Sequence, residues 1–565
     1  MKFAASLVLA GVSLSLFAAG CSGGDAAPAD AEDDVVSGNG PSLCAAVRGN
    51  GELIGAHFQS LAHVVETYGV VDGIAGGSSG SITSFLYESI LLSPAVSTCD
   101  GKACDSAQKS ARVALALKSI MGYGEVVASS NDALAVQDTV AIAMKVKKEA
   151  EAQGALAAVS QANVQELAQK LKAVLGIQEL KDIVNPELFA MLEDTAHLAF
   201  NVGEIQTSIK TLGAFSVDQN RLFFRPGLLN WKSLANLFGR VGDFYAGYGP
   251  ADANGFAAWL DACADSTTGK VWDEAAGVAT KGGTCGGDFG KLVTTYRDKA
   301  RASNAAPRRL GEKVGGPALH KLISTSVLTG AAASQYEASR IEYLAGKYPT
   351  GAIASFTPSF EDIKFGYWGG AEDLARLAQN AQGFGDEKTR KMTSLGSDAT
   401  WGDILSASPA EPGLSRFVKL ADGRYSAGGW SDLAPVLALK NIGCKRVVYV
   451  QRQGDESVFA AQIAVQLGMS EAKWKALYDL STQDSGYAVS VAKADAVWCT
   501  NWNAFTATQQ AELAKDAYNA PFELRGISRR KQVREYARSS TTPLGIVGCS
   551  AGVRGTKTWQ DIAGK

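Results

Sequence analysis

Histidine and proline are scarce in this chain, which has only four His and 15 Pro among 565 residues. So few histidines leave little room for imidazole-based metal sites and catalytic triads. Lys and Arg total 54 against 57 Asp and Glu, a formal net charge of −3. Without a basic excess the composition gives no support to a nucleic-acid partner, and none is predicted. A hydrophobic content of 46% argues against a mostly disordered chain.

The amino end has the pattern of an export signal. A basic start precedes an apolar or small stretch over 3–19, which is short for a bilayer-spanning helix, and Cys21 follows. This pattern resembles a bacterial lipoprotein signal over 1–21. The resemblance implies that Cys21 becomes the mature N-terminus and carries acyl chains that anchor the exported protein to the envelope. Because Ser22 rather than Asp follows, the outer membrane is favoured over the inner. An ordinary signal peptide with a coincidental Cys is the alternative.

A tether is expected behind this segment. Residues 22–41 are small, acidic and rich in Ala, Gly and Pro, so they cannot bury a core and should form a flexible linker. No later segment has the length and apolarity of a transmembrane helix. The predicted membrane contact is therefore through the lipid anchor alone.

Residues 42–98 have the alternating pattern of an α/β fold. Short apolar stretches at 43–47 and 70–75 predict strands. A helical pattern between them stops at Gly69, and the helix after the second strand should end before Pro94. Strand, helix, strand and helix in quick succession predict a mostly parallel sheet.

A helical insertion is expected to interrupt this core. Residues 99–348 contain long stretches rich in Ala, Leu, Lys and Gln, including 315–345, with helical periodicity and almost no strand signal. Strand-like segments return afterwards at 363–368 and 447–450, with a helix over 433–442. We therefore predict a discontinuous α/β core formed by 42–98 and 349–565.

The cysteines support export to an oxidising compartment. Cys99 and Cys104 enclose a short loop, and Cys263 and Cys285 flank a Gly-rich loop, so each pair is expected to form a local disulfide. The other pairings stay open. Half a zinc site at Cys99 and Cys104 is the alternative, but no second ligand pair lies nearby. No metal is predicted.

The motif that carries chemistry is Gly76-Gly77-Ser78-Ser79-Gly80, a match to G-x-S-x-G. It follows a predicted strand and precedes a predicted helix, as a nucleophile elbow requires. Glycines two residues either side of Ser78 relieve crowding where the chain reverses. The hydroxyl is then presented at a helix N-terminus, where unpaired N–H groups favour developing negative charge. A plain Gly/Ser loop at a sheet edge is the alternative interpretation.

With Gly49-Asn50-Gly51 after the first strand and His57 in the next helix, this motif resembles the patatin-like phospholipases. The resemblance covers roughly 43–98 and 350–450. It implies an α/β/α sandwich and a serine acyl hydrolase that cleaves lipid or other carboxylic esters through an acyl-serine, without a cofactor. Ser78 would be the nucleophile. The oxyanion donors would be main-chain N–H groups, drawn from Gly49, Asn50, Gly51 and Ser79.

The base is where the sequence departs from this family. Counted back from Pro435, the family's dyad aspartate falls on Ala427, which cannot accept a proton. Asp422 and Asp432 lie close in sequence, but Asp422 equally predicts a hairpin turn and Asp432 a helix N-cap. A serine hydroxyl needs a neighbouring base to become a good nucleophile. A degenerate, non-catalytic lipoprotein that binds lipid or a protein partner is therefore the second hypothesis.

A histidine base is the third hypothesis and would make the protein a serine peptidase or a general esterase. It requires one histidine to lie against the serine, whereas a structural role is the alternative for each; the candidates are His57, His63, His197 and His320. The aromatic-rich run over 222–248 is predicted to be either an acyl-chain pocket or lid, or the core of the insertion.

Overall fold

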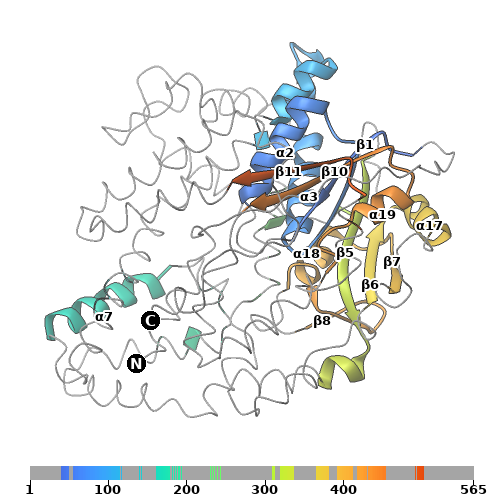
Figure 1. Ribbon diagram of the computed structural model, residues 1–565. Helices are drawn as coiled ribbons and strands as arrows, with labels where there is room; N and C mark the ends of the chain where they lie inside the picture. Colours follow the sequence, from blue (N-terminus) through green and yellow to red (C-terminus); the bar gives the residue numbers. More distant parts are fainter. Residues whose placement is uncertain are drawn as a thin grey trace.

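The computed structural model describes part of the chain (Figure 1). The described residues are 40–49, 55–114, 116–117, 161–177, 308–311, 319–335, 364–380, 391–410, 417–428, 431–453, 490 and 493–501, with single residues between 139 and 242. The predicted signal at 1–21, nearly all of the tether and most of the predicted insertion lie outside them. The same holds for Cys263 and Cys285, whose predicted disulfide stays a prediction.

Within the described residues, nine strands form one mixed, mostly parallel sheet. Its main path runs β11-β10-β1-β2-β5-β6-β7 (Figure 1). The parallel strands are β11 (Ala496–Asn501), β10 (Arg446–Gln453), β1 (Leu43–Val47), β2 (Gly73–Gly77) and β5 (His320–Leu328). Strand β6 (Lys364–Gly369) runs antiparallel to β5, and β7 (Lys391–Gly396) runs parallel to β6. A short hairpin, β8 (Val418–Lys419) and β9 (Tyr425–Ser426), joins β5 through β9.

Helices cover both faces of this sheet, so the predicted α/β class is confirmed. One core packs α2 (Gly55–Tyr68), α3 (Ser79–Leu92) and α18 (Trp401–Ala407) on one face of the sheet. The other core packs α17 (Ala371–Gln379) and α19 (Val436–Asn441) on the opposite face. Successive strand residues point to opposite faces. Accordingly, Ala45 and Val47 of β1 belong to the first core, and Cys44 and Ala46 to the second.

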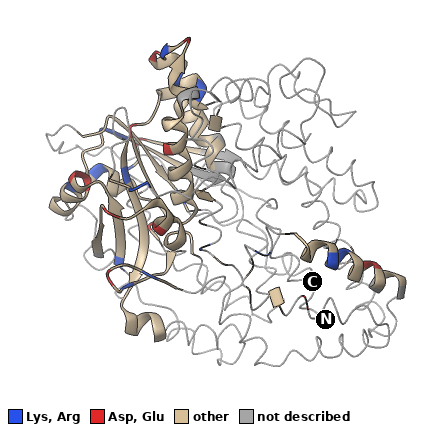
Figure 2. Ribbon diagram, turned by 180° about the vertical axis from the view of Figure 1, so that it is seen from behind, with Lys and Arg blue, Asp and Glu red and all other residues tan. Residues whose placement is uncertain are grey.

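The remaining described elements are short or stand alone. Helix α4 (Pro94–Ser97) follows α3 and leads into the small hairpin of β3 (Thr98–Cys99) and β4 (Lys102–Ala103). Helix α7 (Gln161–Leu175) lies in the predicted insertion. Lys and Arg are interspersed with Asp and Glu over the described elements (Figure 2). Over those same elements, no helix is long and apolar enough to cross a membrane.

The first strand has the predicted bounds and the first helix has the predicted end, whereas the second strand is shifted. Strand β1 spans 43–47, and α2 ends before Gly69, whose φ of 98° lies in the left-handed region that favours glycine. Strand β2 begins only at Gly73, because both backbone groups of Val71 are bound by the Tyr87 hydroxyl, at 3.0 and 3.1 Å, instead of by a neighbouring strand.

One strand lies where a helix was predicted. Residues 320–328 fall in the helical stretch expected over 315–345, yet they form β5 between β2 and β6. The apolar residues of HKLISTSVL fit a helical period as well as a strand, so periodicity alone does not distinguish the two. The β-branched residues Ile323, Thr325 and Val327 are the signal for a strand. The predicted insertion is thus corrected for these residues, and the rest of the domain division stays a prediction.

Among the described cysteines, two disulfides are present. Cys99 and Cys104 are joined across the β3–β4 turn, which confirms the predicted local disulfide and not the zinc alternative. Cys44 of β1 is joined to Cys444, just before β10, over a sequence separation of 400 residues. The second disulfide ties the starts of two adjacent parallel strands that lie far apart in the sequence.

Removing the long-range disulfide is expected to destabilise the protein more than removing the local one. In the chain-entropy account, the constraint on the unfolded chain grows with the logarithm of loop length, which gives about 6 kcal/mol for Cys44–Cys444 and about 2 kcal/mol for Cys99–Cys104. Denaturant unfolding of the two paired Cys→Ala variants measures both losses. An equal or smaller loss for the long-range pair would contradict this expectation.

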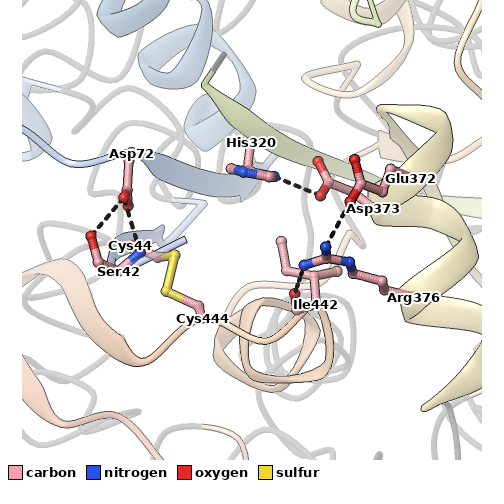
Figure 3. A network of polar contacts seen from close by, with 9 residues as sticks. All are labelled: Ser42, Cys44, Asp72, His320, Glu372, Asp373, Arg376, Ile442 and Cys444. Atoms are coloured by element: carbon pink, nitrogen blue, oxygen red, sulfur yellow. Dashed lines mark hydrogen bonds and ion pairs between the residues drawn. A yellow bond between two sulfur atoms is a disulfide. The ribbon is translucent and has the colours of Figure 1, made fainter. Parts of the chain in front are cut away.

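A polar network joins the amino-terminal ends of β1, β2 and β5 (Figure 3). These ends lie opposite the carboxyl end of β2, where Ser78 follows. Both oxygens of Asp72 accept hydrogen bonds at the start of β1, from Ser42 and from Leu43 N–H at 2.9 Å. The backbone oxygen of Asp72 accepts from His320 N–H at 2.9 Å. His320 Nδ1 lies 2.7 Å from Asp373 Oδ1. The network therefore ties β1, β2 and β5 to α17.

The His320–Asp373 pair is expected to make stability depend on pH. The hydrogen bond to the Asp373 carboxylate raises the pKa of His320 above its ordinary 6.5. Its stabilising contribution is therefore full below pH 6.5 and is lost as the pH rises through the higher folded-state pKa. His320→Gln should lower the free energy of unfolding more at about pH 5.5 than at about pH 9, measured by denaturant unfolding. A loss in the free energy of unfolding that grows toward high pH would have the wrong sign and would refute this expectation.

Candidate functional site

Ser78 forms a strained bend between β2 and α3. Its φ of 52° and ψ of −127° lie outside the helical and extended regions, and Ser78 is one of two non-glycine residues with positive φ in the described chain. Such a conformation costs on the order of 1–3 kcal/mol and persists only where surrounding contacts enforce it. The predicted strand–turn–helix context of G-x-S-x-G is therefore present.

The glycines around Ser78 are required by close approach of the backbone. A Cβ at Gly76 would lie 2.6 Å from the Gly80 oxygen, and a Cβ at Gly80 would lie 2.7 Å from the Val47 oxygen. Real Cβ atoms do not come that close, so larger residues would open the turn. The spacing of glycines two residues either side of the serine thus has the predicted steric cause.

The predicted oxyanion turn begins directly beside Ser78. A Cβ at Gly49 would lie 3.0 Å from Ser78 Cβ and 3.1 Å from the Gly77 oxygen. Ser79 is buried at the first turn of α3, where helix N–H groups lack partners within the helix. Asn50 and Gly51 lie outside the described residues. The structure therefore brings together Gly49, Ser78 and Ser79 at the carboxyl ends of β1 and β2.

Within the described residues, the Ser78 side chain takes no part in structural hydrogen bonding. It makes no capping bond to α3, and the hydrogen bonds of Ser78 in this part of the chain are those of its backbone. The residue is 6% exposed. Its hydroxyl is thus held at a helix start, beside a glycine turn, without a partner in the described part of the protein.

Asp432 lies on the segment that passes the elbow. A Cβ at Gly77 would lie 2.6 Å from Ser431 Cβ, and a Cβ at Gly49 would lie 2.8 Å from Leu433 Cδ2. Residues 431–433 therefore pack against the two glycines that lie beside Ser78. Asp432 is fully buried; Oδ2 accepts from Tyr367 Oη at 2.5 Å and Oδ1 from Ala434 N–H at 3.0 Å. The predicted N-cap role of Asp432, at the start of a helix over 433–442, is wrong, because α19 begins at Val436 with Pro435 as its N-cap.

Asp422 lies in an exposed turn of the β8–β9 hairpin. Gly423 has a φ of 86°, as the Asp-Gly turn predicts. Asp422 Oδ2 lies 2.7 Å from Arg424 Nε, and this hydrogen bond holds the pKa of Asp422 below its ordinary value. The carboxylate is therefore committed to an ion pair at the surface. Of the two predicted bases, only Asp432 lies on a segment packed against the elbow.

Ala427 follows β9 with its side chain fully buried in the second core, and its N–H donates to the Ser326 oxygen at 2.9 Å. The next residue, Gly428, packs against the end of α18, since a Cβ there would lie 2.1 Å from the Ser408 oxygen. The glycine of the Ala-Gly-Gly sequence is thus a close-packing residue. The position counted as the family's aspartate has no acid–base group.

The described histidines have partners away from Ser78. His57 Nδ1 lies 2.8 Å from Thr83 Oγ1, and His63 Nδ1 lies 3.2 Å from Glu66 Oε2. His320 pairs with Asp373 at the opposite ends of the strands. His197 lies outside the described residues. A histidine base for Ser78 stays a hypothesis.

The aromatic run over 222–248 is described only at single positions. Ala235 is buried in the first core and Phe238 packs against it. A Cβ at Gly242 would lie 2.1 Å from the ring of Phe85 on α3. Gly242 therefore lies against α3, while a pocket or lid role for the run stays a prediction. Among the described residues, no group of three or more His, Cys, Asp or Glu could hold a metal ion.

Two residues at the site carried no local sequence signal. Ser408 Oγ accepts from Ser78 N–H at 3.0 Å across 330 residues, and Tyr367 binds Asp432 from β6. Both residues lie within 350–450, the later of the two stretches that the family resemblance covers, and this is the one sequence signal that pointed to them. Searches against protein-family models, curated proteins and solved structures found no match to this chain.

Proposed function

We propose that the protein is a serine acyl hydrolase with a patatin-like α/β/α core, which cleaves carboxylic esters of lipids through an acyl-Ser78 intermediate. The observation that carries the proposal is the strained Ser78, whose Cβ lies 3.0 Å from where a Cβ at Gly49 would be. A serine enforced in that conformation at a helix start, beside a glycine turn, is suited to attack a carbonyl whose oxygen the nearby N–H groups can stabilise.

Asp432 is the proposed base. Ser78 Oγ attacks the ester carbonyl while its proton passes to the Asp432 carboxylate, and the alcohol leaves with that proton. A water then attacks the acyl-serine by the same proton route and releases the acid. The N–H of Ser79 and N–H groups of the 49–51 turn would stabilise the oxyanion. Bonds from Tyr367 and Ala434 orient the carboxylate.

Trapping with a fluorophosphonate tests this proposal. The reagent phosphorylates activated serines, with fluoride as the leaving group, and peptide mapping identifies the site. We expect about one label per folded protein, located on Ser78, and suppression of the label by an ester substrate. A folded protein that stays unlabelled, or a label confined to another serine, would overturn the proposal.

A catalytically degenerate protein that binds lipid or a protein partner is the second candidate. It is favoured by Ala427 at the expected aspartate position and by the engagement of both Asp432 oxygens by other groups. Vesicle flotation separates the two candidates when it is combined with fluorophosphonate trapping. Lipid binding without any serine labelling supports the degenerate protein, and labelling of Ser78 contradicts it.

Anchoring in the cell envelope is proposed together with the activity. Two disulfides in the described part of the chain suit an exported protein. Lipidation at Cys21 would place the hydrolase at a membrane surface, the location of its proposed substrates. Incorporation of labelled palmitate that disappears in Cys21→Ser would support the anchor, and incorporation unchanged by this substitution would refute it.

A further inference from the structure

The bend at Ser78 takes the Ser78 N–H out of the hydrogen-bonding pattern of the sheet. Gly77 is the last residue of β2 that pairs with β5, opposite Ser324. Ser78 turns away into α3 while β5 continues to Leu328. The Ser78 N–H therefore loses the strand partner that an uninterrupted ladder would supply, at a buried position where an unpaired N–H is costly.

The hydroxyl of Ser408 occupies this gap. Ser408 Oγ accepts from Ser78 N–H at 3.0 Å and donates to the Ser324 backbone oxygen at 2.7 Å. Ser408 is fully buried. One hydroxyl thus acts as acceptor and donor at once and bridges the end of β2 to β5 where direct pairing stops.

Helix α18, which has Ser408 as its C-cap, is rigidly placed. Thr400 and Asp403 form a capping box at the start of α18. Trp401 is fully buried, donates to Glu88 Oε2 of α3 at 3.1 Å and packs on Phe85 with ring centroids 5.2 Å apart. Helix α18 is therefore anchored on α3, the helix that Ser78 begins, so the bridge spans two ends of one packed unit.

We infer that Ser408 is the positioning residue of the nucleophile, which holds Ser78 in its strained conformation through the Ser78 amide. The inference rests on the proposed function. Without the hydroxyl, the Ser78 N–H is buried and unpaired, and the residue can relax from its φ of 52°. Relaxation moves Oγ relative to Gly49 and Ser79. The same geometry commits the Ser78 N–H to Ser408, which leaves stabilisation of the oxyanion to other N–H groups.

Steady-state kinetics of two substitutions at this position test the inference on an ester substrate. Ser408→Ala should lower kcat about 10- to 100-fold, because an error of about 1 Å in placing a reacting atom costs that much, while KM changes little. Ser408→Thr retains the hydroxyl and should recover most of the rate. The matched control is Ser406→Ala on the same helix, whose hydroxyl donates to the Gly402 oxygen and does not touch Ser78; its kcat should be unchanged.

Rates are expressed per folded protein, with folding measured by circular dichroism. If Ser408→Ala does not fold, Ser408→Cys replaces it, since a thiol is a weak hydrogen-bonding group of similar shape and the same drop is expected. An unchanged kcat in the folded variant, alongside an inactive Ser78→Ala, overturns the positioning role alone. Equal losses in the variants of Ser406 and Ser408 also overturn it. Turnover that persists in Ser78→Ala overturns the proposed function itself.

Discussion

Ester turnover is expected to fall by at least about a thousandfold when Ser78 is replaced by alanine, because the acyl-serine route is then closed and only stabilisation of a water-driven reaction remains. The assay measures kcat and KM on a short-chain chromogenic ester and on phospholipid vesicles. The backbone should be little disturbed, since the Ser78 hydroxyl makes no capping bond and its backbone contacts are kept.

The control for Ser78→Ala is Ser84→Ala, six residues further along the chain in α3. Ser84 is fully buried and its hydroxyl donates to the Gly80 oxygen at 2.8 Å, so the substitution removes a comparable group from the same helix. The kcat of Ser84→Ala per folded protein should equal that of the unmodified protein. If Ser78→Ala retains the rate, or if both variants lose it equally, Ser78 is not the nucleophile.

Replacing Asp432 by asparagine is expected to lower kcat by about 10²- to 10⁴-fold, the range that a lost general base costs. Asparagine has nearly the shape of aspartate, and its carbonyl can still accept a bond from Tyr367 or from the Ala434 N–H. The expected loss is therefore in proton transfer rather than in packing. This loss in proton transfer is measured by kcat and by the pH–rate profile on the ester substrate.

Two further aspartates make the Asp432 result specific. Asp373→Asn removes a charge from another buried aspartate, which pairs with His320 away from the elbow, and should leave kcat per folded protein unchanged. Asp422→Asn tests the other predicted base, which the structure places in an ion pair with Arg424. A loss on changing Asp422 with none on changing Asp432 would reverse the assignment of the base.

The sequence predicted the elbow well because its signals are local. Gly76 and Gly80 flank Ser78 by two residues, and the steric need for Gly76 arises within the turn, since a Cβ there would meet the Gly80 oxygen. Strand β1 was equally clear, since all five of its residues are apolar and buried. Both features depend on neighbours in sequence, so single-sequence reasoning reaches them.

The other parts of the site depend on contacts between distant segments. Ser408 reaches Ser78 across 330 residues, and Cys44 reaches Cys444 across 400. Strand β5 was predicted as helix, because whether its mixed apolar pattern becomes a strand is decided by β2 and β6 on either side. Such pairings arise from tertiary packing and have no counterpart in local spacing. The same reason left both candidate bases, Asp422 and Asp432, open in the sequence, and the structure adds that residues 431–433 pack against Gly49 and Gly77.

The most direct test of the account is to capture the acyl-enzyme. The protein is mixed with a slowly hydrolysed ester, quenched in acid within the first turnover and measured by intact mass and peptide mapping. The account predicts a mass increase equal to one acyl group, located on Ser78, absent in Ser78→Ala and slow to form in Asp432→Asn. Ester hydrolysis with no acyl group on Ser78 at any quench time would contradict it.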